Sequence, residues 1–296
     1  MELGISTYTY GWAVDAAGAG TDVCLGAEAI TLTDAVTSTD ARTSADTVAG
    51  QPFDELTLIG LARSMQLSLI QVGDNLPLHH FSPKRLSAFK DLLRQRHIAL
   101  EIGAKGLTVE HLQLYIGICR EMGVRLLRFV IDDDGYRPSV ETVIKIIRSH
   151  LGLLEGQGII LAIENHDRLT VKELEVIMKA IDSPFVGICL DSVNSMGAGE
   201  GIGTVIDVLA PYAVNLHIKD FGIKRPGHKQ GFIVEGRIAG EGKLDIPFLL
   251  EKVRSYQRCK TCVLEQWVPF ESDAAQTIAK EKCWAEKGIG YLKSIL

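Results

Sequence analysis

Short apolar runs alternate along this chain with longer segments of helical periodicity, and no other feature constrains the fold as strongly. Runs rich in Val, Ile and Leu predict buried strands, whereas apolar residues at helical spacing predict amphipathic helices. A strand followed by a helix, repeated many times, is the pattern of βα units around a parallel sheet. Eight strands are predicted, at Leu3–Thr7, Ser68–Val72, Ala99–Gly103, Leu126–Ile131, Ile159–Ile163, Val186–Leu190, Ala213–Ile218 and Thr261–Glu265.

The segments between these strands carry signals of helix ends. Ser82 stands before Pro83, and Thr170 is followed three residues later by Glu173, as in a capping box. Eight repeats fit a closed barrel better than a doubly wound sheet, and barrels of about this length commonly form one domain. We therefore predict an α/β fold in which residues 1–296 form a single (β/α)8 TIM barrel. Its helices include Pro83–Gln95, Val109–Met122, Ser139–Glu155, Val171–Ile181, Ile246–Tyr256 and Ala274–Leu296.

Residues 15–51 interrupt this alternation as a long insertion after the first predicted strand. They are rich in Ala, Thr, Asp, Gly and Ser and contain few large apolar side chains, so they have little surface to bury. The next helix is expected to start near Phe53. In a barrel the loop after a strand lies on the catalytic face, so this insertion is either a lid over the site or a surface insertion without a role.

Charge and composition exclude several classes of protein. The formal net charge is −6 and the Lys and Arg residues are dispersed, whereas nucleic-acid binding requires clustered positive charge. The chain does not start with a basic segment followed by an apolar one, and no apolar run approaches the roughly 18 residues of a membrane span. We expect a cytoplasmic enzyme that acts on a small molecule, with no nucleic-acid or membrane partner.

The cysteines do not suggest a special function. Six of them are spread thinly along the chain, which is not the pattern of a disulfide framework. Cys259 and Cys262 have the spacing of a metal or redox pair. No second pair exists, however, and these two residues begin an apolar strand, so we interpret them as structural.

Four consecutive predicted strands end in residue types that bind metals. Glu164, Asp191, His217 and Glu265 stand at or near the ends of the fifth to eighth strands. Side chains at the C-terminal ends of barrel strands converge on one face, so all four are expected to meet. Without a cation, acidic groups gathered at one rim would repel one another and be poorly solvated. Three carboxylates and one imidazole favour a single divalent ion, with Mn²⁺ preferred and Co²⁺, Mg²⁺ or Zn²⁺ as alternatives.

The motifs around these residues resemble those of the xylose-isomerase-like barrel superfamily. That group holds sugar epimerases and isomerases, inosose dehydratases, dehydroshikimate dehydratases, sugar-acid decarboxylases and abasic-site endonucleases. The resemblance covers nearly the whole chain except the 15–51 insertion. It rests on Ile163-Glu164-Asn165-His166, Leu190-Asp191-Ser192-Val193-Asn194, Leu216-His217-Ile218-Lys219-Asp220, Gly240-Glu241-Gly242-Lys243-Leu244-Asp245 and Leu264-Glu265.

By this resemblance, Glu164, Asp191, His217 and Glu265 map onto the family's metal ligands, and the two glutamates onto the proton-transferring pair of its ketose epimerases. Many members place a His three residues after the ligand Asp, where this chain has Asn194. This difference, together with the acidic net charge, argues against the endonuclease branch. Barrel relatives often self-associate, so the resemblance also implies a homo-oligomer.

Metal-assisted enolate chemistry would serve more than one reaction. An ion that polarises the carbonyl of a polyol ketone stabilises the enediolate formed when the adjacent carbon loses its proton. With Glu164 and Glu265 as catalytic residues that remove and return this proton, the chain would be a sugar isomerase or epimerase acting on a small polyol ketone or sugar acid. The alternatives are a lyase that decarboxylates a 3-oxo sugar acid or dehydrates its substrate, and a non-catalytic sugar-binding barrel.

Five further side chains are candidates for substrate binding. His166 and Lys219 each lie two residues after a predicted ligand, so they point the same way in an extended strand. Asn194 occupies the family's His position, and Asp74 follows the second predicted strand. Arg237 belongs to a basic loop after the seventh strand. If this loop binds a carboxylate or a phosphate, acid substrates are favoured over neutral sugars.

Overall fold

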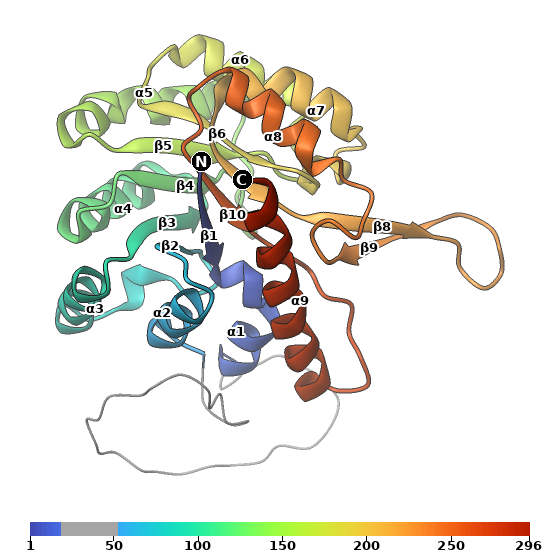
Figure 1. The fold of residues 1–296 in the computed structure, drawn as a ribbon. Helices are drawn as coiled ribbons and strands as arrows, with labels where there is room; N and C mark the ends of the chain where they lie inside the picture. The colour runs from blue at the N-terminus through green and yellow to red at the C-terminus, as the bar shows by residue number, and fades with distance from the viewer. Residues whose placement is uncertain (19–52) are drawn as a thin grey trace.

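The computed structural model describes residues 1–18 and 53–296, in which eight parallel strands close into a barrel surrounded by helices (Figure 1). The order around the barrel is β1, β10, β7, β6, β5, β4, β3, β2, and β10 closes the ring against β1. The predicted TIM barrel is therefore confirmed. The barrel strands are β1 Glu2–Ser6, β2 Leu69–Val72, β3 Ala99–Lys105, β4 Leu126–Val130, β5 Ile160–Glu164, β6 Val186–Asp191, β7 Ala213–Ile218 and β10 Thr261–Leu264.

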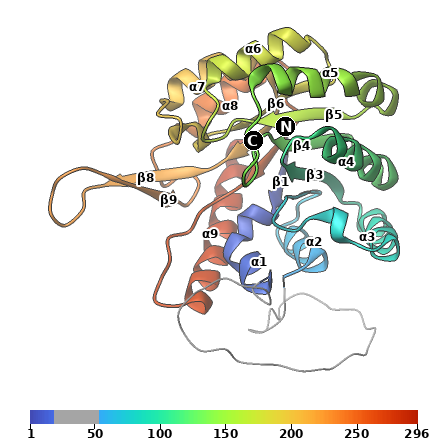
Figure 2. The same ribbon diagram turned by 180° about the vertical axis from the view of Figure 1, so that it is seen from behind.

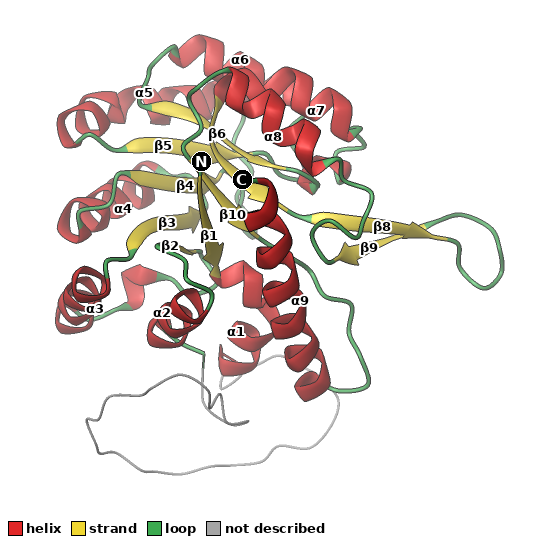
Figure 3. Cartoon of the chain, viewed as in Figure 1, coloured by secondary structure: helices red, strands yellow, loops and turns green. Residues whose placement is uncertain are grey.

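The helices lie outside the strands and cover the barrel (Figure 2, Figure 3). The side chains of Ser82, Ser139 and Thr170 each accept a hydrogen bond from the backbone N–H three residues later, which fixes where three helices begin. None of the described helices is long and apolar enough to cross a membrane. The α-helices are α1 Gly11–Gly18, α2 Glu55–Ser64, α3 Pro83–Arg96, α4 Val109–Met122, α5 Val140–Gln157, α6 Val171–Ile181, α7 Ile202–Leu209, α8 Ile246–Ser255 and α9 Ala274–Ile295, and short 3-10 turns occupy Thr7–Tyr10, Leu78–His80, Asn194–Met196 and Ala210–Tyr212.

The start of the predicted insertion at 15–51 was wrong. Residues 15–18 belong to α1, which follows directly on the 3-10 turn after β1, because the helix continues through small residues that the sequence pattern did not distinguish from a loop. The rest of the insertion lies outside the described residues, so its role as a lid stays a prediction. Asp54 caps α2 by accepting the Thr57 N–H at 2.8 Å, close to the expected start near Phe53.

The chain after β7 forms an antiparallel hairpin where a basic loop was expected. Strands β8 (Asp220–Lys224) and β9 (Ile233–Arg237) pair with each other and project away from the barrel (Figure 1). The side chains of Ile223, Phe232 and Val234 are exposed on this hairpin. Its strands therefore lack the alternation of buried and exposed positions from which a strand can be predicted.

Asp220 closes the base of this hairpin. Its carboxylate accepts hydrogen bonds from the backbone N–H groups of Gly240, Gly242 and Leu244 at 2.9, 2.9 and 3.0 Å. Gly240 has a φ of +90°, and a Cβ at Gly242 would lie 2.0 Å from Asp220 Oδ1, so both positions require glycine. The Gly240-Glu-Gly motif thus wraps the backbone around Asp220 and leads the chain into α8.

The interior of the barrel contains a buried polar network below the C-terminal rim. Gln71 and Asn215 donate from their side-chain amides to Glu101 Oε2 at 3.0 and 3.1 Å, and Asn215 also donates to Thr261 Oγ1 at 2.8 Å. Burial raises the pKa of Glu101 despite these hydrogen bonds. Because each amide is fixed by partners on other strands, the network gives the residues above it a rigid floor.

Candidate metal centre

The four predicted metal ligands converge at the C-terminal end of the barrel. Glu164 and Asp191 are the last residues of β5 and β6, His217 is the last but one of β7, and Glu265 directly follows β10. All four side chains are buried. Asp191 and His217 are register partners on adjacent strands. The closed barrel therefore brings together side chains that lie far apart in the sequence.

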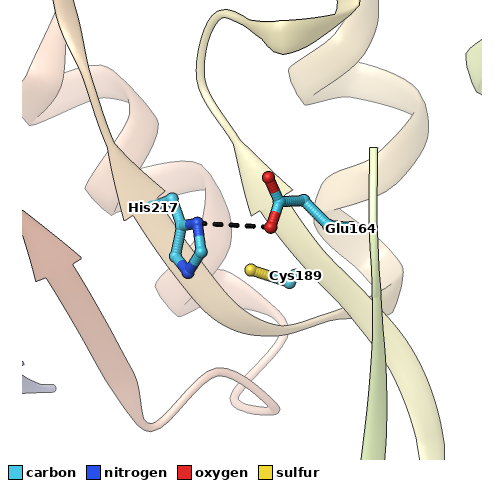
Figure 4. Close-up of side chains that lie close together, drawn as sticks. All are labelled: Glu164, Cys189 and His217. Carbon is cyan, nitrogen blue, oxygen red and sulfur yellow. Dashed lines mark ion pairs between the residues drawn. The ribbon is translucent and has the colours of Figure 1, made fainter. Parts of the chain in front are cut away.

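The His217 imidazole lies at the centre of this cluster. Its Nδ1 is 3.3 Å from Glu265 Oε1, 3.5 Å from Glu164 Oε2 and 4.0 Å from Asp191 Oδ2. Figure 4 shows the ring facing the Glu164 carboxylate. Burial lowers the pKa of His217, but the carboxylates of Glu265 and Glu164 outweigh this effect, and the pKa is raised above its ordinary value.

The cluster offers the kinds of donor atom that a divalent ion requires. Asp191 Oδ1 accepts the backbone N–H groups of Val193 and Asn194 at 2.9 and 2.8 Å, so only Oδ2 remains for another ligand. Within the described part of the chain, Asp191 Oδ2, Glu265 Oε2 and both His217 nitrogens are buried without a hydrogen bond. The two carboxylate oxygens are ion-paired with Lys219, whereas the buried imidazole nitrogens have no hydrogen-bond partner among these residues, which is costly unless a further partner binds them. Carboxylate oxygens and an imidazole suit Mn²⁺, Mg²⁺, Co²⁺ or Zn²⁺, so the residues fit the predicted ion.

A buried arginine, which the sequence patterns did not indicate, stands among these carboxylates. Arg128 lies within β4 and pairs with both Glu164 and Asp74, with Nη1 2.6 Å from Asp74 Oδ1. Burial lowers the pKa of Arg128, but Glu164 and Asp74 outweigh this effect and raise it well above its ordinary value. Its position inside the apolar run Leu126–Val130 was the available signal, because a charge in a buried strand needs a charged partner.

Lys219 and Asn194, both predicted to bind substrate, lie against the ligand carboxylates. The Lys219 ammonium is 2.9 Å from Asp191 Oδ2 and 3.0 Å from Glu265 Oε2, in ion pairs that lack the alignment of hydrogen bonds. Asn194 donates to Glu164 Oε1 at 2.8 Å and accepts from Lys219 at 3.3 Å. Burial lowers the pKa of Lys219, but Asp191 and Glu265 outweigh it, so the side chain remains an ammonium.

With a neutral His217, a divalent cation would balance the charges of this region. Its four carboxylates outnumber its two cations, and a metal-binding imidazole is neutral. An excess of negative charge in a buried site is unfavourable without a cation. The carboxylates are those of Asp74, Glu164, Asp191 and Glu265, and the cations are Arg128 and Lys219.

A cavity of about 520 Å³ opens beside the cluster. Lys219 and Asn194 form part of its wall, together with Tyr8, Trp267 and Val234 of the hairpin. Its volume is typical of sites for small organic ligands. The cavity therefore gives a sugar-sized molecule access to the Lys219 ammonium.

The other predicted substrate contacts lie at different distances from this cluster. Asp74 is part of it through its buried ion pair. His166 is half-exposed and borders a small hollow beside Glu164. Arg237 pairs with Glu235 on the hairpin at 2.6 Å and is not among the residues that line the cavity. The structure thus brings Asp74 to the cluster, leaves His166 at its edge and does not bring Arg237 to it.

The barrel and this acidic cluster together define a class of protein. Residues 61–295 match the family model of the xylose isomerase-like TIM barrel, and the chain belongs to this family. It is 31% identical over 224 residues to a 3-oxo-isoapionate decarboxylase of Pectobacterium atrosepticum, a match that covers 76% of this chain and 82% of the relative.

Solved structures of the same fold include enzymes and metal-binding proteins. The structure of D-psicose 3-epimerase from Clostridium cellulolyticum with D-tagatose has a TM-score of 0.66 and 14% identity, with 100% of this chain and 99% of that chain covered. The structure of the IOLI protein with a bound zinc atom has a TM-score of 0.63 and 15% identity, with 98% and 99% covered. At these identities the likeness shows the fold alone.

Proposed function

We propose that this chain is a divalent-metal-dependent decarboxylase of a small 3-oxo acid derived from a sugar. The observation that carries the proposal is the presence of two cations, Arg128 and Lys219, among the predicted ligands Glu164, Asp191 and Glu265. A neutral ketose does not need a cation in the wall of its site, whereas a substrate carboxylate does. The 31% identity to a 3-oxo-isoapionate decarboxylase supports the same choice.

Lys219 is the side chain that we assign to the substrate carboxylate. It lines the cavity and is 15% exposed, whereas Arg128 is 4% exposed and lies deeper. A divalent ion would take over the neutralisation of Asp191 and Glu265, which frees the ammonium for an incoming anion. Arg128 holds Glu164 in place through their buried ion pair.

Decarboxylation fits the charges of this site. A divalent ion held by the four predicted ligands would supply a Lewis acid for the 3-oxo group. The bond to the carboxyl carbon breaks, CO₂ leaves, and the electron pair remains in an enolate whose carbon then takes a proton from solvent. Lys219 orients the carboxylate before this step, and Asn194, held between Lys219 and Glu164, keeps both groups in place.

Epimerisation, the first choice from the sequence, is the second candidate. Glu164 and Glu265 both lie within 3.5 Å of His217 Nδ1, so two carboxylates are available for proton transfer. Each is engaged by a cation, however, Glu164 by Arg128 and Glu265 by Lys219. Decarboxylation begins without a general base, whereas epimerisation requires one carboxylate to remove the proton and another to return it.

The two candidates differ in the fate of the substrate carbons. We would incubate the Mn²⁺-loaded protein in D₂O with a panel of 3-oxo sugar acids and the corresponding neutral ketoses, and follow the carbons by NMR. Release of CO₂ from an acid supports the decarboxylase. Deuterium exchange in a ketose with all carbons retained, and no CO₂ from any acid, would instead establish the epimerase.

A variant tests the role of Lys219. With the decarboxylated acid as substrate, we expect Lys219→Met to lower kcat/KM by at least about 30-fold, which corresponds to the roughly 2 kcal/mol lost when one partner of a buried ion pair is removed. Lys224→Met is the matched control, because Lys224 is 53% exposed on the hairpin and pairs with Glu235. Equal kcat/KM values for both variants would contradict the assignment.

A further inference from the structure

Cys189 places a thiol beside two of the predicted ligands. It lies on β6, two residues before Asp191, is fully buried, and has Glu164 as its register partner on β5. Figure 4 shows the sulfur pointing into the gap between the Glu164 carboxylate and the His217 ring. The Sγ atom, a Glu164 oxygen and a His217 nitrogen all lie within 4.8 Å of one another. The carboxylate cluster thus has a sulfur donor at its side.

The surroundings of this thiol are those of an unused ligand. Cys189 donates its S–H to Asn215 Oδ1 at 3.1 Å, which leaves the sulfur lone pairs free to bind an ion. Both His217 nitrogens are buried without a hydrogen bond to any described residue.

We propose that Glu164, Cys189 and His217 form a second coordination set in this centre, which binds thiophilic divalent ions such as Zn²⁺ and Cd²⁺. This inference rests on the proposed metal centre, because His217 and Glu164 belong to both sets. Sulfur and nitrogen donors suit soft and borderline ions, whereas Mn²⁺ and Mg²⁺ prefer oxygen. On binding, the ion replaces the thiol proton, which passes to solvent.

The two coordination sets exclude each other. An ion on Cys189 occupies His217, which Asp191 and Glu265 need as their third partner in the other set. It also competes with Arg128 for Glu164 Oε2, the oxygen that faces His217. Thiophilic ions are therefore inhibitors that displace Mn²⁺, and Cys189 is the residue that makes the centre sensitive to them.

Absorbance and magnetic resonance together test this inference. The Mn²⁺-loaded wild type would be titrated with Cd²⁺, following the thiolate-to-cadmium charge-transfer band and the release of Mn²⁺ by EPR. The matched control is Cys262→Ser, which changes a buried free cysteine on β10. We expect one equivalent of Cd²⁺ to give the band and release Mn²⁺ in both proteins. In Cys189→Ser and Cys189→Ala we expect Cd²⁺ to give no such band. In both variants Mn²⁺ should stay bound during the titration and should still raise Tm.

Two results would overturn the inference in different ways. An undiminished band in both Cys189 variants, or no band in a wild type that binds Mn²⁺, excludes Cys189 as a ligand and leaves the metal centre standing. If neither Mn²⁺ nor Cd²⁺ raises the Tm of the wild type, the metal centre itself is wrong, and the second coordination set falls with it. Cys283, exposed on α9, contributes the same background in every protein.

Discussion

Glu281 on α9 should make the stability of this protein fall as the pH rises. Its carboxylate is 1% exposed and accepts the backbone N–H groups of Trp12 and Ala13 at 3.0 and 3.2 Å, at the start of α1. Burial outweighs these hydrogen bonds and raises the pKa of Glu281 from 4.5 to about 7. This difference corresponds to about 3 kcal/mol. Because the folded pKa is the higher one, the stabilisation is complete below pH 4.5 and is lost as the pH rises through 7.

Glu281→Gln removes the ionisation and tests this reasoning. We would measure the free energy of unfolding by urea at pH 5, 6, 7 and 8 for the variant and the wild type, both free of added metal. Relative to the wild type, the variant should gain roughly 2–3 kcal/mol between pH 5 and 8. The Gln side chain has an NH₂ group in place of one carboxylate oxygen, so this group faces one of the two backbone N–H donors. The resulting change in the free energy of unfolding does not depend on pH. Glu286→Gln, on the exposed face of α9, is the control. Parallel pH profiles for Glu281→Gln and the wild type would refute the argument.

Three further changes test the centre and the barrel. Asp191→Asn should weaken Mn²⁺ binding by more than about 100-fold and abolish the rise in Tm on adding Mn²⁺, and an unchanged rise would remove Asp191 from the ligand set. Arg128→Met leaves the Glu164 and Asp74 carboxylates without their cation, so we expect the free energy of unfolding in urea to fall by about 3–5 kcal/mol. A fall below about 1 kcal/mol would show that these ion pairs contribute little to stability. Gly187→Ala places a Cβ 2.5 Å from Val214 Cγ1 and should lower the free energy of unfolding by about 1–3 kcal/mol. Gly117→Ala is the control, because a Cβ there has nothing within 4 Å and should not destabilise the protein. Equal free energies of unfolding for the two variants would contradict the packing at Gly187.

The convergence of the four candidate ligands could be predicted from the sequence because the pattern that indicates it is local. An apolar run that ends in Glu164, Asp191 or His217 can be read directly, and the barrel topology then determines that strand ends meet. The same pattern indicates Asn194 and Lys219, because each lies a few residues beyond or directly after the end of a predicted strand. The fold and the candidate ligands therefore follow from patterns that span no more than one βα unit.

Arg128 and Cys189 could not be foreseen in this way. The partners of Arg128 are Glu164 and Asp74, on loops or strands that only the closed barrel places beside β4. Cys189 in an apolar strand looks the same as a core cysteine until the register sets it opposite Glu164. The hairpin was missed for another reason, since its strands pair only with each other and show no alternation of buried and exposed positions.

Asp220 makes the connection between β7 and α8 a place at which a loop of another length can be inserted beside the cavity. Asp220 and Arg237 are register partners, so the hairpin leaves and rejoins the barrel at neighbouring points, both held by one carboxylate and its glycine turn. A tip of another length can be exchanged there at small cost, because loop-closure entropy changes slowly with length. Since Val234 lines the cavity, such an exchange would remodel the wall of the cavity that we propose for the substrate. The barrel strands that carry the candidate ligands would not change in such an exchange. Substrate specificity could therefore evolve in the hairpin while the residues of the metal centre stay the same.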